Sequence, residues 1–223
     1  MGSFSEAIGV TDFQDCNILR RLFSELLGTF VYISILLSGL SSADSAVVNA
    51  LATGLLVASI VAIFGHVSGG HINPAITIGA LVCDQITLLP AIFYILAQVI
   101  GAVLGVLVAR LLSLKSPEGT DSLELWKKFG LETLFSFLLV SVAVSVPDFR
   151  RGSTGLAGAL AIGVSIIAPL CAITNYRGSM NPVRSLAVSM FCRDFTSHWV
   201  FWAGPILGGI LAGLVYRFIL TVR

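Results

Sequence analysis

The chain has 223 residues, of which 56% are hydrophobic and 11% charged, with a mean hydropathy of +0.95. A soluble domain carries about 25% charged residues, so this composition indicates an integral membrane protein. At roughly 20 apolar residues per transmembrane helix, the length admits about six to eight spans and excludes a further soluble catalytic domain. The net charge of +1, without a long run of like charges, excludes a nucleic-acid-binding face.

The first 19 residues form an N-terminal segment that does not read as a cleaved signal, because Glu6, Asp12 and Asp15 precede the first apolar run. Six apolar segments beyond it are long enough to cross a bilayer. They lie at about 22–40, 47–65, 88–113, 129–147, 155–173 and 199–220. The sequence therefore predicts an all-α membrane protein with a single channel domain over 1–223.

Two shorter apolar stretches, at about 73–83 and 181–192, are too short to span the bilayer. Each opens with an Asn-Pro pair, Asn73-Pro74 or Asn181-Pro182. Asn is a favoured helix N-cap, and Pro is favoured in the first turn, where its missing N–H would have no partner. We therefore expect two re-entrant half-helices that begin inside the membrane.

An internal repeat relates the two halves, about 20–113 and 124–220. Asn73 and Asn181 lie 108 positions apart, and Gly101 and Gly105 recur at Gly209 and Gly213 at the same spacing. Glu25 of the first span recurs, one position off, at Glu132 of the fourth. Three spans per half force opposite membrane orientations, so the half-helices enter from opposite faces and can meet near the midplane. Non-helical backbone at that depth must line a cavity or be buried.

Two loops and the start of the last span resemble the aquaporin (major intrinsic protein) family. Residues 65–75 read GHVSGGHINPA and residues 178–185 read GSMNPVRS, with Val183 where the family has Ala. Residues 198–205 read HWVFWAGP, which is also similar. The resemblance covers about Phe23 to Leu220. It implies six transmembrane helices plus two half-helices in an inverted repeat, both termini in the cytoplasm, a plasma-membrane location and a homotetramer with one pore per subunit.

The expected pore centre lies where the half-helices begin. Opposed half-helix N-termini would place two positive dipole ends, about half a charge each, at one point and repel cations. The Asn73 and Asn181 amides would donate to a central water, whose hydrogens then point outward and interrupt proton hopping. The residues expected at the centre are Asn73, Asn181, Pro74, Pro182, Ala75 and Val183, and those expected on pore-lining loops are His66, Gly70, His71 and Ser179.

Two acids, Glu25 and Glu132, would be costly in lipid and should face the bundle interior. The resemblance implies that they brace the pore loops. The alternative is a buried acid that accepts loop N–H groups without a transport role.

A selectivity filter of four residues follows from the resemblance: Thr53, Pro169, Gly178 and Arg184. Pro169 is reached by counting back from Asn181 without a gap. Arg184 would supply a fixed charge with several donors. Thr53 and Pro169 replace the aromatic ring and imidazole of the water-specific pattern, so we expect a wider filter that passes glycerol or urea. Ser185, where the glycerol branch has Asp, and the aromatic pair Phe201-Trp202 favour the water branch instead.

The predicted function is therefore a passive channel for water and small neutral solutes that excludes protons and ions, with no enzymatic activity and no cofactor. The alternatives are a strictly water-selective channel, a junctional or adhesion protein with little transport, or a coupled carrier, for which few acids lie deep in the spans. His66 and His71 lack the spacing and third ligand of a metal site. Four cysteines without a CxxC pair (Cys16, Cys83, Cys171 and Cys192) predict neither zinc nor a disulfide framework. Basic residues number six against seven on the two faces, so charge gives no orientation.

Overall fold

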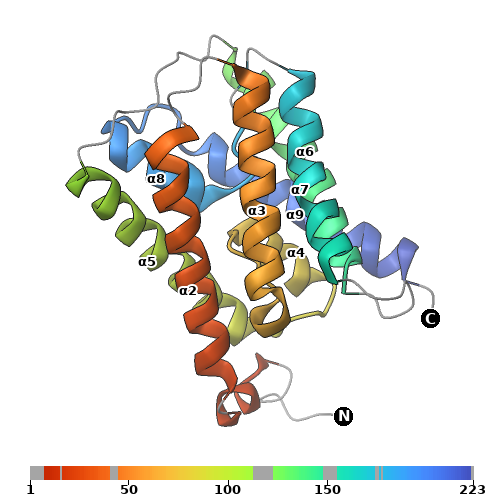
Figure 1. Ribbon diagram of the computed structural model, residues 1–223. Helices are drawn as coiled ribbons and strands as arrows, with labels where there is room; N and C mark the ends of the chain where they lie inside the picture. Colours follow the sequence, from red (N-terminus) through yellow and green to blue (C-terminus); the bar gives the residue numbers. More distant parts are fainter. Residues whose placement is uncertain are drawn as a thin grey trace.

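The computed structural model describes residues 8–15, 17–40, 45–112, 123–147, 155–173, 176 and 178–221; Glu6 and Cys16 lie outside these ranges. Within them, six helices are long and apolar enough to cross a membrane, and no strand occurs (Figure 1). They are α2 (Asn17–Ile35, extended by a π-helical turn at Leu36–Leu40), α3 (Ala46–Ser68), α5 (Leu88–Leu111), α6 (Leu125–Ser145), α7 (Gly155–Ala172) and α9 (Val200–Val215, extended by Tyr216–Leu220). The predicted all-α class and the six spans are confirmed.

The two shorter helices are α4 (Pro74–Val82) and α8 (Pro182–Cys192). Asn73 is the N-cap of α4 and its side chain accepts from the Ala75 N–H, while Asn181 caps α8 and accepts from the N–H groups of Val183 and Arg184. A proline occupies the first turn of each. The Asn-Pro signal therefore located both helix starts because it combines a cap acceptor with a residue that needs no donor partner there.

Glycines bring the first and third spans of each half into close contact. A Cβ added at Gly101 of α5 would lie 2.3 Å from the Leu26 carbonyl oxygen of α2, and one at Gly208 of α9 would lie 2.3 Å from the Thr133 carbonyl oxygen of α6. These two contacts are equivalent, so the structure pairs Gly101 with Gly208. The expected pairing of Gly101 with Gly209 is wrong by one position, because the contacts between the first and third spans repeat every 107 residues while the Asn-Pro motifs repeat every 108.

Gly209 and Gly213 instead face half-helix α4. Their added Cβ atoms would lie 2.5 Å from the Ala75 carbonyl oxygen and 2.6 Å from that of Gly79. The second spans, α3 and α7, meet through a reciprocal contact in which Gly54 approaches the Gly163 carbonyl at 2.5 Å and Gly163 approaches that of Gly54 at 2.6 Å. The two halves thus pack around an approximate two-fold axis between α3 and α7.

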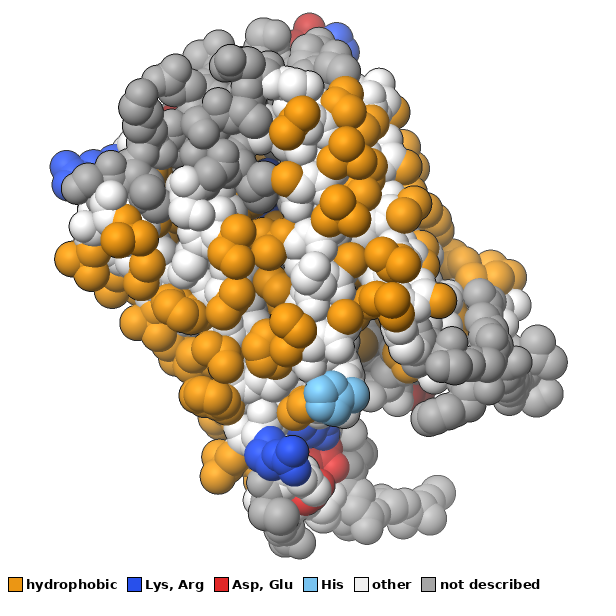
Figure 2. All heavy atoms as spheres, in the orientation of Figure 1, with side chains coloured by type: hydrophobic (Ala, Val, Ile, Leu, Met, Phe, Trp, Pro, Cys, Tyr) orange, Lys and Arg blue, Asp and Glu red, His pale blue; other side chains and the backbone are white. Residues whose placement is uncertain are grey.

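The outer surface is apolar along the helices. Large hydrophobic side chains such as Leu55, Ile63 and Leu96 are exposed, and Figure 2 shows apolar side chains spread along the visible helices, with charged groups near both ends and a histidine near one of them. This distribution fits a protein whose sides face lipid or other subunits and whose ends face water.

Candidate functional site

Two buried glutamates hold the loops that lead into the half-helices. The Glu25 carboxylate accepts from the backbone N–H groups of His71 at 2.9 Å and Ile72 at 2.7 Å, and also from Ser68 Oγ at 2.6 Å and Gln98 Nε2 at 2.8 Å. The side chains of Glu25 and Glu132 are both fully buried, and each carboxylate accepts from two successive backbone N–H groups. Such bonds satisfy a charge that would otherwise be expensive at this depth.

Glu132 makes the equivalent contacts in the second half. Its carboxylate accepts from the N–H groups of Ser179 at 2.7 Å and Met180 at 2.8 Å, and from the Tyr176 hydroxyl at 2.6 Å. The geometry is that of a brace in both halves.

The residues before the two asparagines share an unusual backbone. Ile72 and Met180 have positive φ values of 45° and 55°, in the left-handed region that non-glycine residues rarely adopt. Their N–H groups are those held by Glu25 and Glu132, so the braces offset the local strain.

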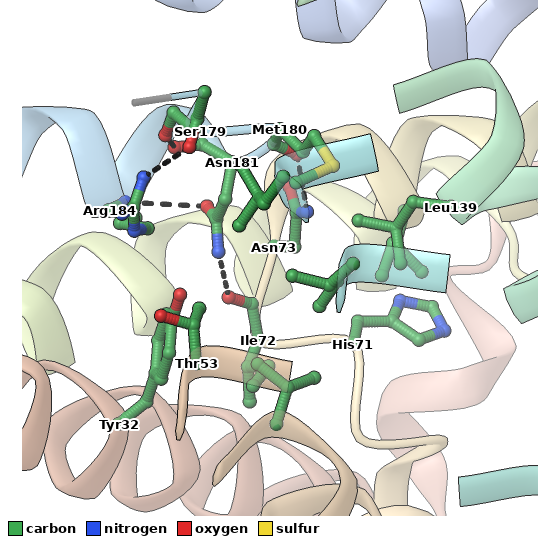
Figure 3. A pocket seen from close by; sticks show the side chains of 15 residues that line it. Tyr32, Thr53, His71, Ile72, Asn73, Leu139, Ser179, Met180, Asn181 and Arg184 are labelled. Carbon is green, nitrogen blue, oxygen red and sulfur yellow. Dashed lines mark hydrogen bonds between the residues drawn. The ribbon is translucent and has the colours of Figure 1, made fainter. Parts of the chain in front are cut away.

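The two asparagines cross-link the loops at the meeting point of the half-helices (Figure 3). Asn73 Nδ2 donates to the Met180 carbonyl at 2.8 Å, and Asn181 Nδ2 donates to the Ile72 carbonyl at 3.0 Å. Because each Oδ1 caps its own helix, the orientation of both amides is fixed. One amide hydrogen of each asparagine is used in this exchange, which leaves one for the pore.

A narrow cavity passes beside this cross-link. The volume of the cavity that the centres of water molecules can occupy is about 20 Å³. A single water molecule needs roughly 10–15 Å³ by the same measure. The lining residues are Tyr32, Thr53, Val57, His71, Ile72, Asn73, Ile76, Leu139, Ile166, Leu170, Gly178, Ser179, Met180, Asn181 and Arg184. The wall combines apolar side chains with polar groups from both halves, and the cavity has room for about one water molecule.

Three of the four expected filter residues line this cavity: Thr53, Gly178 and Arg184. Arg184 NH1 donates to the Gly178 carbonyl at 2.8 Å, and its Nε is buried with no hydrogen-bond partner among the described residues. Thr53 Oγ1 donates to the Asn49 carbonyl at 2.7 Å.

Pro169 does not line the cavity, although it is buried inside α7. Ile166 and Leu170 line it instead, and their spacing of four places them on one face of α7; Leu170 lies about 100° around the helix from Pro169. The ungapped count therefore misses the pore-facing register by one residue.

The other expected residues divide between wall and surroundings. His71 and Ser179 line the cavity, and His71 Nδ1 lies 3.1 Å from Thr77 Oγ1. His66, expected on a pore-lining loop, is exposed in the last turn of α3. Gly70, also expected there, is buried beside Ser68. Neither His66 nor Gly70 lies on the cavity wall. The first two residues of each half-helix are buried behind the asparagines and do not line the cavity: Pro74, Ala75, Pro182 and Val183.

Tyr32 is a wall residue that the sequence reasoning missed. It comes from α2, is 2% exposed, and lies beside Thr53 across from Arg184 (Figure 3). Its position, seven residues after Glu25, puts both side chains on the interior face of α2. That spacing is the signal that could have found it.

Among the described residues, no group of three His, Cys, Asp or Glu side chains could hold a metal ion. Cys83, Cys171 and Cys192 are free thiols.

Six spans, two opposed half-helices and a buried polar meeting point define a multi-pass membrane protein of the channel class. The family model for the major intrinsic proteins matches residues 12–216. The chain is 38% identical over 224 residues to the lens fiber major intrinsic protein of Lithobates pipiens, covering 95% of this chain and 85% of the relative, and 33% identical over 223 residues to aquaporin-1 of Homo sapiens, covering 92% and 83%. The chain belongs to the major intrinsic protein family, whose members are passive channels and not enzymes.

A solved structure described as the aquaglyceroporin from Plasmodium falciparum shares this fold. Its TM-score is 0.80 over 91% of this chain and 97% of that chain, at 21% sequence identity. At this identity the likeness concerns the fold.

Proposed function

We propose that the protein is a passive water channel whose conduction path is the cavity beside Asn73 and Asn181. The observation that carries the proposal is the cavity itself, because Asn73 and Asn181, whose amides are fixed by hydrogen bonds, lie on its wall together with Arg184 and apolar side chains from both halves. A water that leaves bulk solvent finds hydrogen-bond partners at these points and passes an apolar surface between them.

Proton and cation exclusion follows from the same geometry. The N-termini of α4 and α8 face each other, so two positive dipole ends raise the energy of a cation at the centre. The remaining amide hydrogens of Asn73 and Asn181 donate to a central water, which must then direct its own hydrogens outward. The direction of hydrogen bonding along the chain of water molecules therefore reverses at that central water, and a proton cannot hop past it.

A second candidate is the passage of small neutral solutes such as urea or glycerol. It is favoured by the wall residues Thr53, Leu170 and Gly178, none of which carries an aromatic ring or an imidazole. Against it, Tyr32 adds bulk at the same level, and the free volume is that of about one water.

Stopped-flow light scattering on proteoliposomes tests both candidates. Osmotic shrinkage faster than that of empty liposomes supports water conduction, and urea or glycerol uptake faster than in empty liposomes supports the second candidate. Shrinkage no faster than in empty liposomes would contradict the channel proposal and favour an adhesion role.

Substitution at the filter separates the two solutes. Thr53→Phe with Leu170→His should suppress urea uptake more than water flow, because the pair restores bulk and one donor. Pro169→His is the matched control, since its position lies off the cavity wall, and it should leave the ratio of urea to water permeability unchanged.

A further inference from the structure

Two arginines occupy equivalent places at the ends of the third spans. Arg110 lies in the last turn of α5, and Arg217 lies in the turn that extends α9. They are 107 positions apart, the same spacing that relates Glu25 to Glu132. The repeat therefore places them as a symmetric pair, one at each face of the membrane.

Arg110 bonds to the C-terminal end of half-helix α8. Its NH2 donates to the Met190 carbonyl at 2.5 Å and lies 3.4 Å from that of Phe191. The backbone N–H groups that follow the helix, those of Arg193 and Asp194, both go to the Ser189 carbonyl. The guanidinium thus takes last-turn carbonyls that a helix end otherwise leaves without a backbone partner.

Arg217 does the same for half-helix α4. Its NH1 donates to the Val82 carbonyl at 3.0 Å, and its NH2 lies 2.8 Å from Asp84 Oδ2. The other last-turn carbonyls of α4 are those of residues 79, 80 and 81, which accept from the backbone N–H groups of residues 83, 85 and 84. Arg217 therefore completes the set of partners at this helix end.

We propose that Arg110 and Arg217 are positioning residues of the pore, which clamp the C-terminal ends of the half-helices. A cation at a helix C-terminus interacts favourably with the dipole, and each arginine belongs to a long span that fixes its height in the membrane. With the glutamate braces at the other ends, the clamps set where Asn73 and Asn181 meet. This step rests on the proposed role of that meeting point as the pore centre.

The competing explanation is simple anchoring, in which exposed basic side chains reach to the headgroup region. A lysine anchors as well as an arginine, so that explanation predicts no effect of Arg→Lys at either position. The clamp predicts an asymmetry. Arg217 reaches two different acceptors with two separate nitrogens of its rigid guanidinium fork, a geometry that the single nitrogen of a lysine does not share, whereas Arg110 uses a single nitrogen.

The test compares purified R110Q, R217Q, R110K and R217K with wild type by amide hydrogen–deuterium exchange and by water flow per channel. R20Q is the matched control, because Arg20 is an exposed arginine in the first turn of α2. We expect exchange at residues 193–194 to rise in R110Q and exchange at residues 83–85 to rise in R217Q. The rise should be roughly tenfold, the factor that corresponds to one lost charge-assisted hydrogen bond.

Water flow per channel should fall in both Gln variants, recover in R110K and stay low in R217K. Exchange and flow at the level of R20Q in both Gln variants, or full recovery in R217K, would overturn the proposal. If liposomes that contain the wild-type protein show no more water flow than empty liposomes, the proposed function is wrong. The exchange measurement would still decide whether the arginines clamp the helix ends.

Discussion

At the scale of single residues, the buried carboxylates of Glu25 and Glu132 each accept several hydrogen bonds. From donors in the described part of the protein, Glu25 accepts four hydrogen bonds and Glu132 three. Each pair of backbone N–H groups belongs to a loop held partly in the left-handed region. The charge is tolerated because it is fully paired, and it acts on the pore through the loops it holds.

Glu25→Gln should therefore destabilise the protein. The amide keeps one acceptor oxygen but turns an NH2 group toward donors, which costs about 1–3 kcal/mol for each buried donor left without an acceptor. Thermal unfolding in detergent should show a clear fall in Tm. Glu124→Gln is the control, because Glu124 forms an ion pair with Lys127 at an exposed site, and its Tm should match wild type. Equal Tm values for both variants would show that the brace contributes nothing.

Tyr32 supplies a second prediction at this scale. Its ring narrows the cavity beside Thr53, so Tyr32→Ala should raise urea permeability several-fold relative to water. Tyr32→Phe keeps the ring and should leave the ratio unchanged. Paired urea-uptake and osmotic measurements on the same liposomes check both, and a ratio in Tyr32→Ala that stays at the wild-type value would show that the ring does not limit the path.

At the scale of elements, the glycines decide how closely α9 approaches half-helix α4. Gly209→Ala would bring a methyl group within 2.5 Å of the Ala75 carbonyl oxygen, so backbone must move. Overpacking of this kind costs typically 1–3 kcal/mol, and Tm should fall. Gly130→Ala is the opposite case, since nothing lies within 4 Å of its added Cβ, and the gain of about 0.5–1 kcal/mol in helix propensity should raise Tm. A fall in both variants would argue against packing as the cause.

Much of the element order could be read from the sequence, and the limits have a physical origin. Asn-Pro pairs mark helix starts chemically, so α4 and α8 begin where predicted. No comparable mark fixes the length of the loop between α7 and Asn181, and one residue there rotates the pore-facing side of a helix by about 100°. For that reason the prediction named Pro169 on α7, whereas Leu170 lines the cavity. Thr53 and Arg184, which do not depend on the length of that loop, both line it.

The repeat shows the same limit. The path from Glu132 to Met180 is one residue longer than that from Glu25 to Ile72. A constant spacing therefore cannot hold for both loops and spans, and the glycine pairing was wrong for that reason. Arg110 and Arg217 are related by the spacing of 107 that holds for the first and third spans, and not by the spacing of 108 between the Asn-Pro motifs.

At the scale of the whole molecule, the apolar sides of the spans need cover that a bilayer or neighbouring subunits provide. We propose a homotetramer, as the family resemblance implies. Light scattering of the detergent-solubilised protein, corrected for bound detergent, should give four times the 23.6 kDa chain mass. A mass of one chain at all protein concentrations would contradict the proposal.

The number of spans determines on which face of the membrane each segment ends. Six full spans put both termini on one face, and each half-helix returns to the face from which its loop entered, so α8 ends on the face opposite the termini. Exposed Cys192 lies at that end, and exposed Thr221 follows the last span. A variant that retains only Cys192 and another whose sole cysteine is Thr221→Cys should differ in intact cells.

A membrane-impermeant maleimide should label one of these two variants before permeabilisation and both afterwards. Basic residues divide almost evenly between the faces, so charge does not favour one orientation. The prediction depends instead on α9, the span that separates Cys192 from residue 221. Equal labelling of both variants before permeabilisation would mean that α9, the span between the two positions, does not cross the membrane, and the count of six full spans would then be wrong.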